Sequence, residues 1–575
     1  MPTTSRRKTK PVTQARASET KGLQAASPES RDALGASYDV FIHDMSEDRR
    51  GIARLGEAVV FVEGALYGER VQIRIRERKK NYLSAVVTAV LEETPYKKPD
   101  PCPLLEPEIG PSCGGCPYGR LTYETQLVLK EKQVRDKISR ISGLGTVPIL
   151  PIIPSDRREA YRNKAVYRAA YDPKTGAGQV GFYAPSSHTL IACSHCAIQS
   201  AAANAAASVL ASYLSFMADK KGHPSIETMT VKTAFASRQV MIILETKGEG
   251  LPCISALTDD FRKALSGAGF SLTSLLLKRR EGKKVANDLL WGRGWVEEDL
   301  AGLRMEISED SFYQVNPFQT EKLYQVVLHY AALTGTETVY DLYCGMGSIG
   351  LFLASQARKI IGIEQARAAI KAARRNAKRN GINKATYYEG KAENLLPILL
   401  QAAEEKPDII ILDPPRKGCH PALLDAVLHA APQKIIYVSC HPATLARDLK
   451  ALTKGSYLPE QVQPVDMFPQ TSAVETVALL SKLDVDKHIS VEIELDEMDL
   501  TSAESKATYA QIKEYVWNKF QLKVSTLYIA QIKRKCGLEL REHYNKSKKE
   551  KQIIPQCTPE KEEAIMDALR HFKMI

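Results

Sequence analysis

The second half of the chain, from Thr338 onward, alternates short apolar runs with helical segments, and this alternation limits the possible fold most. The runs are "ETVYDLYCG", "KIIGIE", "PDIIILDPPR" and "KIIYVSC". Continuous β-branched runs of this kind are typical of buried parallel strands. Strands that alternate with helices predict an α/β fold with a doubly wound parallel sheet. Because the strand ends of such a sheet converge on one crevice, we expect four residues to share a site: Gly345, Glu364, Asp413 and Cys440.

A glycine-rich turn follows the first of these strands in "DLYCGMGSIG" (341–350). Its spacing, Gly345-x-Gly347-x-x-Gly350, occurs in dinucleotide and other nucleotide sites, and a purely structural turn is the alternative. Asp341 precedes the glycines, and Glu364 ends the next strand, where a carboxylate can accept both ribose hydroxyls of an adenosine cofactor. These acids and the later "DPP" favour S-adenosylmethionine over NAD.

The third strand ends in "ILDPPRKG" (411–418). Its two prolines fix a rigid bend, which holds Asp413 over the expected site. In amino-group methyltransferases an aromatic residue generally follows the prolines. Here Arg416 follows them, which argues against that chemistry.

Cys440 lies at the end of the fourth strand, in "YVSCHPATLARD" (437–448). Pro442 is expected to open a helix that continues to Lys450. The amide groups at the start of that helix can stabilise a thiolate and lower the pKa of Cys440 below about 8.5. The alternative is an inert thiol that fills a corner of the core.

Glu475 lies in the otherwise apolar run "DMFPQTSAVETVALL" (466–480). A lone carboxylate in such a run is costly unless it is paired or functional. Burial would raise its pKa towards that of a useful base.

A methyl donor, a cysteine and a buried glutamate together fit methylation of carbon 5 of uracil. Carbon 5 is a poor nucleophile until a thiolate adds to carbon 6, after which the resulting enolate can take the methyl group. A base must then remove the proton on carbon 5 so that the cysteine can leave. This chemistry favours a nucleophilic role for Cys440 over packing.

Five motifs together resemble the RNA 5-methyluridine methyltransferase family: "SFYQVN" (311–316), "DLYCGMGSIG", "LDPPRKG", "YVSCHPATLARD" and "DMFPQTSAVE". The resemblance covers roughly 38–483 and is closest to the type that modifies 23S ribosomal RNA. It implies a Rossmann-like methyltransferase domain with Cys440 as nucleophile and Glu475 as base. The residues that it assigns to S-adenosylmethionine are Gln314, Tyr343, Gly345, Glu364 and Asp413. The family often has a histidine shortly before its catalytic glutamate, where this chain has Ser472 and Ala473.

Five cysteines fall into two groups, "CPLLEPEIGPSCGGCPYG" (102–119) and "IACSHCAIQ" (191–199). Four thiolates can hold an iron–sulfur cluster or zinc, and metal-free thiols are the further alternative. The resemblance implies a [4Fe–4S] cluster on Cys102, Cys113, Cys116 and Cys196, with Cys193 as the other candidate for the fourth ligand. Ten residues separate the first two cysteines, where the family more usually has about five. We interpret the difference as an insertion loop.

Changes in composition divide the chain into five segments. The polar, basic segment 1–37 has no apolar core and is not a secretory signal. Residues 38–95 are expected to form a β-barrel similar to a TRAM RNA-binding domain, with Val71, Ile73 and Ile75 inside and arginines outside, where they could contact phosphate. A central α+β domain (96–310) contains the cysteines, and the catalytic domain (311–483) follows.

Residues 484–575 are expected to form a basic, helical C-terminal extension. Ile512, Val516 and Phe520 recur at helical spacing, and Ser525 can cap a second helix that Gly537 can end. This second helix finishes in Lys533-Arg534-Lys535, and "HYNKSKKEKQ" (543–552) adds further lysines. Two readings stay open: a helix-turn-helix-like nucleic-acid module, or a helical hairpin packed on the catalytic domain.

The bulk properties agree with an RNA partner. The net charge of +12 and the pI near 9.0 favour a polyanion. The segment "YRNK" (161–164) and its neighbours Arg157, Arg158 and Arg168 are expected to face RNA. No apolar run reaches the roughly 18 residues of a membrane helix. Eleven cysteines without a signal segment indicate a reducing compartment.

We therefore expect a cytoplasmic monomer that acts on 23S ribosomal RNA. Two alternatives stay open: a transfer-RNA uridine methyltransferase of the same family, and a non-catalytic RNA-binding iron–sulfur protein. The sequence does not decide which uridine is the target.

Overall fold

The computed structural model describes residues 34–99, 102–105, 111–144, 147–172, 174–218, 225–247, 250–281, 284–402, 406–483, 509–536, 558–572 and 574–575. The chain divides into two compact units, Met1–Asp484 and Val485–Ile575, which are described one at a time. Of the basic segment expected at 1–37, residues 1–33 lie outside the described residues.

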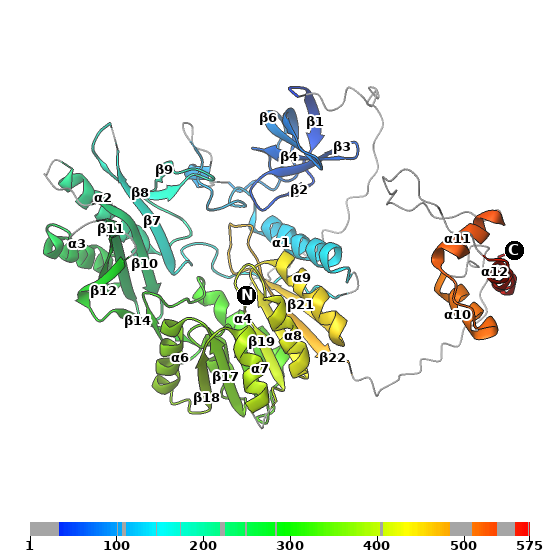
Figure 1. Ribbon diagram of the computed structural model, residues 1–575. Coiled ribbons are helices and arrows are strands. Elements are labelled where there is room, and N and C mark those ends of the chain that lie inside the picture. Colours follow the sequence, from blue (N-terminus) through cyan, green and yellow to red (C-terminus); the bar gives the residue numbers. More distant parts are fainter. Residues whose placement is uncertain are drawn as a thin grey trace, which may run out of the picture. The chain divides into compact units, whose positions relative to one another are not determined.

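The first unit opens with a six-stranded sheet in the order β1-β5-β6-β4-β3-β2 (Figure 1). Its strands are β1 (Ser37–Phe41), β2 (Asp44–Met45), β3 (Gly51–Leu55), β4 (Ala58–Glu63), β5 (Arg70–Arg78) and β6 (Leu83–Glu92). Val71, Ile73 and Ile75 are buried, so the alternation expected along β5 is confirmed. Leu129 of helix α1 (Tyr123–Lys137) packs into the same core, and a π-helical turn, Ile138–Ser142, extends this helix.

A seven-stranded mixed sheet follows, in the order β13-β12-β11-β10-β7-β8-β9. Helices α2 (Ala201–Met217) and α3 (Ile254–Gly267) share one apolar core with it (Figure 1). The strands are β7 (Lys164–Tyr171), β8 (Gly178–Tyr183), β9 (Leu190–Ala192), β10 (Ile226–Ala234), β11 (Gln239–Lys247), β12 (Ser271–Glu281) and β13 (Lys284–Gly292). The hairpin of β14 (Trp295–Leu300) and β15 (Leu303–Ser308) then leads into the next layer.

The predicted doubly wound sheet is confirmed as seven strands in the order β18-β17-β16-β19-β20-β22-β21. They are β16 (Thr338–Leu342), β17 (Lys359–Glu364), β18 (Ala385–Glu389), β19 (Ile409–Leu412), β20 (Lys434–Ser439), β21 (Tyr457–Val465) and β22 (Glu475–Lys482). Within this sheet β22 runs against its two neighbours β20 and β21, and the other pairings are parallel.

Helices cover both faces of this sheet (Figure 1). Ile409 and Ile411 of β19 belong to one core with α4 (Pro317–Ala331), α5 (Ser348–Leu353) and α6 (Arg367–Arg379). Ile410 and Leu412 belong to the other, with α7 (Ala392–Ala402), α8 (Pro421–Ala430) and α9 (Pro442–Leu452). Successive side chains of a strand point to opposite faces, which explains why a continuous apolar run is needed here.

The second unit contains three helices, α10 (Tyr509–Phe520), α11 (Thr526–Lys535) and α12 (Pro559–His571), around a small apolar core. Ser525 caps α11 as expected, because its hydroxyl accepts the Tyr528 N–H at 3.2 Å. Two helices were expected, and α12 supplies Ile565 and Leu569 to the core. Gly537 and the lysine-rich 543–552 lie outside the described residues.

None of the helices in the described part of the chain is long and apolar enough to cross a membrane.

Candidate active site

The glycine turn between β16 and α5 has the geometry of a nucleotide-binding loop. Gly347 has φ +82°, and a Cβ there would lie 2.7 Å from the Tyr387 hydroxyl, so a side chain is excluded. Glu364 accepts the N–H of Gly345 at 3.3 Å and that of Ala366 at 2.8 Å. Its carboxylate is thereby fixed at the end of β17, with lone pairs left for ribose hydroxyls.

Asp341 lies beneath this turn and is fully buried. Its Oδ2 accepts the Gly350 N–H at 2.9 Å, while its Oδ1 has no hydrogen-bond partner in the described part of the chain. Burial raises the pKa of Asp341 to about 7. The turn therefore holds one carboxyl group inside and presents a second, Glu364, at the strand end, and both fit an adenosine cofactor.

Cys440 and Glu475 meet because β22 runs antiparallel to β20. The register pairs Ser439 with Thr476, and the Thr476 hydroxyl donates to the Ser439 carbonyl at 3.0 Å. The start of β22 therefore lies beside the end of β20. Asp413, which follows β19, is close enough to act electrostatically on both residues. Cys440 and Asp413, two of the four residues expected to share a site, therefore lie near each other at this edge of the sheet, and Glu475 lies with them.

Glu475 has the properties expected of a buried base. Its side chain is 3% exposed, and burial, together with the nearby Asp413, raises its pKa to about 8. Burial also raises the pKa of Asp413 to about 7. Two carboxyl groups with pKa values near neutrality therefore adjoin the thiol.

The expected low pKa of Cys440 is wrong for the resting site. Burial, followed by the charge of Glu475, raises the pKa of this thiol to about 11. Pro442 opens α9 as predicted, but the His441 side chain already accepts the Thr444 N–H of its first turn. Burial and two carboxylates outweigh a helix end that is partly satisfied.

Arg416 is the residue that the sequence interpretation undervalued. Its guanidinium donates a hydrogen bond to the Cys440 sulfur and acts to lower the pKa of both Cys440 and Glu475. The sequence did contain a signal for this role, because an arginine directly after a strand-end "DPP" has to lie at the carboxyl edge of the sheet.

Gln314 and Tyr343, the other two residues expected to bind the cofactor, lie on separate segments, before α4 and directly after β16. Gln314 is buried before α4, and its backbone carbonyl accepts from the Asn163 amide at 2.8 Å. Tyr343 has φ +63°, and its hydroxyl approaches the backbone of His420. Their roles stay predictions.

The five cysteines of the two groups, 102–119 and 191–199, line one cavity of about 460 Å³, together with Arg162 and Lys164. Cys193 donates a hydrogen bond to Cys196, which lowers the pKa of Cys196 to about 7. Burial and the neighbouring thiols raise the pKa of Cys116 to about 12. Neighbouring thiolates repel one another, so these cysteines can all be ionised together only when a cation lies among them. Metal ions and iron–sulfur clusters bind thiolates, so this set of side chains fits a bound metal. However, no three His, Cys, Asp or Glu side chains among the described residues are arranged as a metal site.

The segment 161–164 is not an RNA-facing strip as a whole. Tyr161 and Asn163 are buried and bind the backbone carbonyls of Pro469 and Gln314. Arg162 and Lys164 line the cysteine cavity. The prediction is therefore wrong for Tyr161 and Asn163, whose polar groups satisfy neighbouring loops.

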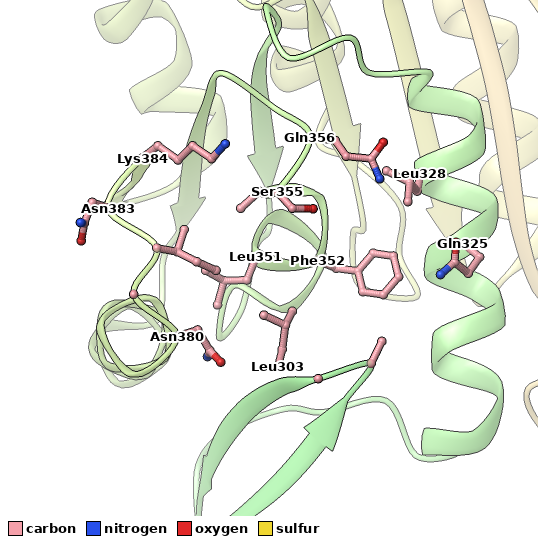
Figure 2. A pocket seen from close by; sticks show the side chains of 15 residues that line it. Leu303, Gln325, Leu328, Leu351, Phe352, Ser355, Gln356, Asn380, Asn383 and Lys384 are labelled. Atoms are coloured by element: carbon pink, nitrogen blue, oxygen red, sulfur yellow. The ribbon is translucent and has the colours of Figure 1, made fainter.

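A larger cavity, of about 730 Å³, lies away from the strand ends that carry Cys440 and Glu475. Figure 2 shows Leu303, Leu351 and Phe352 at its apolar centre, with amide side chains around them. Ser355–Gln356 and Asn383–Lys384 line it just before β17 and β18 begin. It therefore lies at the amino ends of the strands and contains none of the expected site residues.

The chain matches two family models. The model described as tRNA (Uracil-5-)-methyltransferase matches residues 258–483, and the TRAM domain model matches residues 32–88. An uncharacterized RNA methyltransferase of Bacillus cereus is 36% identical over 454 residues, which are 78% of this chain and 96% of the relative. One of Caldanaerobacter subterraneus is 36% identical over 459 residues, 78% of this chain and 99% of the relative.

One similar solved structure is that of the Pyrococcus abyssi tRNA (uracil-54, C5)-methyltransferase in complex with S-adenosyl-L-homocysteine. Its TM-score is 0.59 at 24% identity, and the match covers 77% of this chain and 100% of that chain. This likeness supports the fold. The identity to the bacterial relatives, which extends over most of the chain, shows that the protein belongs to the family of S-adenosylmethionine-dependent RNA uracil-5-methyltransferases with a TRAM domain.

Proposed function

We propose that this protein methylates carbon 5 of a uridine in 23S ribosomal RNA through a covalent adduct with Cys440. The observation that supports it most is the placement of Cys440 and Glu475 on the adjoining ends of antiparallel neighbours β20 and β22. Covalent catalysis of this kind needs a nucleophile and a base close to carbons 5 and 6, and this register brings a thiol and a carboxyl group to one edge of the sheet.

The reaction balances with the groups at this edge of the sheet. The Cys440 thiol gives its proton to solvent, and Arg416 stabilises the thiolate that forms. The thiolate then adds to carbon 6, and the electron pair of the carbon 5–carbon 6 π bond moves into an enolate. S-adenosylmethionine, which Gln314, Tyr343, Gly345, Glu364 and Asp413 would hold, would supply the methyl group for carbon 5 and would keep the electron pair of the sulfur–methyl bond. The Glu475 carboxylate removes the proton from carbon 5, the double bond re-forms, and the sulfur–carbon bond breaks. The thiolate returns and can take a proton again.

The choice of ribosomal RNA over transfer RNA rests on the TRAM domain and the cysteine cavity. The resemblance to the compact transfer-RNA type of the family includes neither of these features. The second candidate is a transfer-RNA uridine, because the Pyrococcus protein named for that activity matches over its whole length. Mapping 5-methyluridine in both RNA classes from cells with and without the protein decides between them. We expect loss of 5-methyluridine from 23S ribosomal RNA alone. Loss confined to transfer RNA would transfer the proposal to the second candidate.

The cysteine cavity is proposed to hold a [4Fe–4S] cluster on Cys102, Cys113, Cys116 and Cys196. Protein purified without oxygen is then expected to be brown and to contain about four irons. Iron analysis of Cys196→Ser and Cys193→Ser tests the ligand choice, because only the first should lose the cluster. Colourless protein with one zinc would contradict the assignment. Loss of the cluster in Cys193→Ser alone would show that Cys193, not Cys196, is the fourth ligand.

The C-terminal extension is proposed to add to RNA affinity. The segment 509–536, which contains α10 and α11, has six lysines and arginines against one acid. Truncation after residue 483 is expected to weaken RNA binding. The slope of the logarithm of the binding constant against the logarithm of the salt concentration should become shallower by about 0.7–0.9 for each lost phosphate contact. Cofactor affinity should not change, since the second unit has a core of its own.

A charge variant of the full chain separates RNA contact from a structural role. Lys523→Gln/Arg534→Gln removes two exposed cations from the segment 509–536, and Arg570→Gln, which removes an exposed cation of α12, is the control. RNA titrations over a range of salt should show the flatter slope in the first variant only. Equal salt slopes for the unaltered protein and both variants would contradict an RNA contact and support a purely structural role for the extension.

A further inference from the structure

The loop that leads to Glu475 is buried, which is unusual for a connecting segment. This base loop, residues 466–474, joins β21 to β22. Asp466, Met467 and Val474 are each fully buried, and Gln470 adopts a left-handed φ of +71°. Buried loops need partners for their backbone polar groups, and a non-glycine residue in this region is strained unless its surroundings hold it.

The partners come from outside the loop. Five successive carbonyls each accept a hydrogen bond from another segment, at 2.9–3.2 Å, in the order Gln319, Asn316, Lys130, Tyr161 and the Tyr118 N–H for residues 466 to 470. Ser472 also donates to the Glu47 carbonyl at 2.9 Å. The backbone that precedes the base is thus held at nearly every peptide.

Helix α1 supplies two connections to the base loop. The first is Lys130, which is completely buried and whose Nζ donates to Asp466 Oδ1 at 2.5 Å and to the Phe468 carbonyl at 2.9 Å. The other oxygen of Asp466 accepts from the Tyr123 hydroxyl at 2.7 Å. A buried ion pair costs desolvation and is often no more stabilising than apolar packing. Its benefit here is a defined geometry for the start of the loop.

The second connection is Gln126, which binds Gln470 in both directions. Its Nε2 donates to Gln470 Oε1 at 3.1 Å, and its Oε1 accepts the Gln470 N–H at 2.8 Å. This two-way contact falls on the one left-handed residue of the loop. Gln126 therefore stabilises the bend from which the chain continues to Glu475.

We propose that Lys130 and Gln126 are positioning residues for proton removal from carbon 5. They act through the base loop and do not touch the reacting atoms. The proposal rests on the proposed function of Glu475 as the base. Cys440 and the glycine turn follow β20 and β16, not the base loop. A change of Lys130 or Gln126 should therefore slow release of the adduct more than methyl transfer.

The test follows methyl transfer and release separately in one turnover. Gln126→Met removes the two-way contact without burying a charge, and release of RNA from the protein is expected to slow about ten- to a hundredfold. Methyl transfer should stay within about threefold of the unaltered protein. The unreleased fraction is read as protein–RNA adduct that survives denaturation, and thermal melting with cofactor titration reports on the fold.

Lys130→Met alone leaves the Asp466 carboxylate buried without its cation and can prevent folding. The double variant Lys130→Met/Asp466→Asn removes both charges and keeps an acceptor for Tyr123. It should also accumulate adduct. Lys132→Met is the matched control, because Lys132 is on the same helix but pairs with Asp44 and Asp136. It should release RNA at the unaltered rate.

Three outcomes would overturn the proposal. Normal release in both Gln126→Met and the double variant, while Glu475→Gln traps RNA, would refute the positioning role and leave the proposed function intact. Equal slowing of methyl transfer and release with a lower melting temperature would show a purely structural role. Normal turnover of Glu475→Gln would remove the base itself, and the proposal with it.

Discussion

Replacing Cys440 with alanine is expected to abolish RNA methylation, by a factor on the order of 10⁴ or more. Without the sulfur, nothing adds to carbon 6 in the proposed reaction, and carbon 5 of uracil is not activated for methyl transfer. Burial keeps the pKa of the resting thiol near 11, so the substitution removes no charge from the folded protein. RNA and cofactor binding should persist, and both are measured by titration beside the transfer of labelled methyl groups.

Cys419→Ala is the matched control for this variant. Cys419 is a buried cysteine of the same domain, in one apolar core with residues of α8 and α9, and it has no part in the proposed reaction. It should methylate RNA normally. Loss of both binding and turnover in Cys440→Ala, or an equal loss in Cys419→Ala, would instead indicate that these thiols matter for packing.

Glu475→Gln is expected to have the opposite character, because methylation proceeds but the enzyme stays attached to its product. Glutamine keeps the size of the side chain and one acceptor oxygen but cannot take the proton from carbon 5. The double bond then cannot re-form, and the sulfur–carbon bond stays intact. A protein–RNA species that survives denaturation should accumulate to about one equivalent, whereas the unaltered protein shows little.

The pH dependence of release provides a second measurement. The pKa of Glu475 is raised to about 8 by burial and by Asp413, so the proton-accepting carboxylate becomes more populated as the pH rises through 8. Release should accelerate over this range in the unaltered protein and be flat in Glu475→Gln. Adduct-free turnover by Glu475→Gln would assign the base elsewhere.

The sequence predicted the parts of the site that depend on strand order alone. Apolar runs located the parallel strands, and strand ends of one sheet share an edge, so Glu364, Asp413 and Cys440 could be grouped in advance. The pKa of Cys440 could not be predicted, because it depends on Glu475 and Arg416, which reach the thiol from other strands. The direction of the pKa shift depends on how deeply the thiol is buried and on how close these charged groups lie. Neither can be read from the neighbouring residues in the sequence.

The burial of Tyr161 and Asn163 was missed for a related reason. A basic, aromatic segment has the composition of an RNA surface, yet these two side chains satisfy carbonyls at Pro469 and Gln314, far away in the chain. Helix α12 was missed although Thr558 and Pro559 are ordinary helix-start residues. In that case the signal was local.

The hydrogen bonds to the base loop determine which fragments of this enzyme can keep the loop in place. Its hydrogen-bond donors include Tyr118, Lys130 and Tyr161, which all precede the matched region 258–483. A fragment that begins at α4 would retain the glycine turn and Cys440 but would leave carbonyls of Phe468, Pro469 and Gln470 without these donors. On the proposed role of Glu475, we therefore expect that a chain able to complete the reaction must begin before Tyr118 and α1, well upstream of the region that the family model matches.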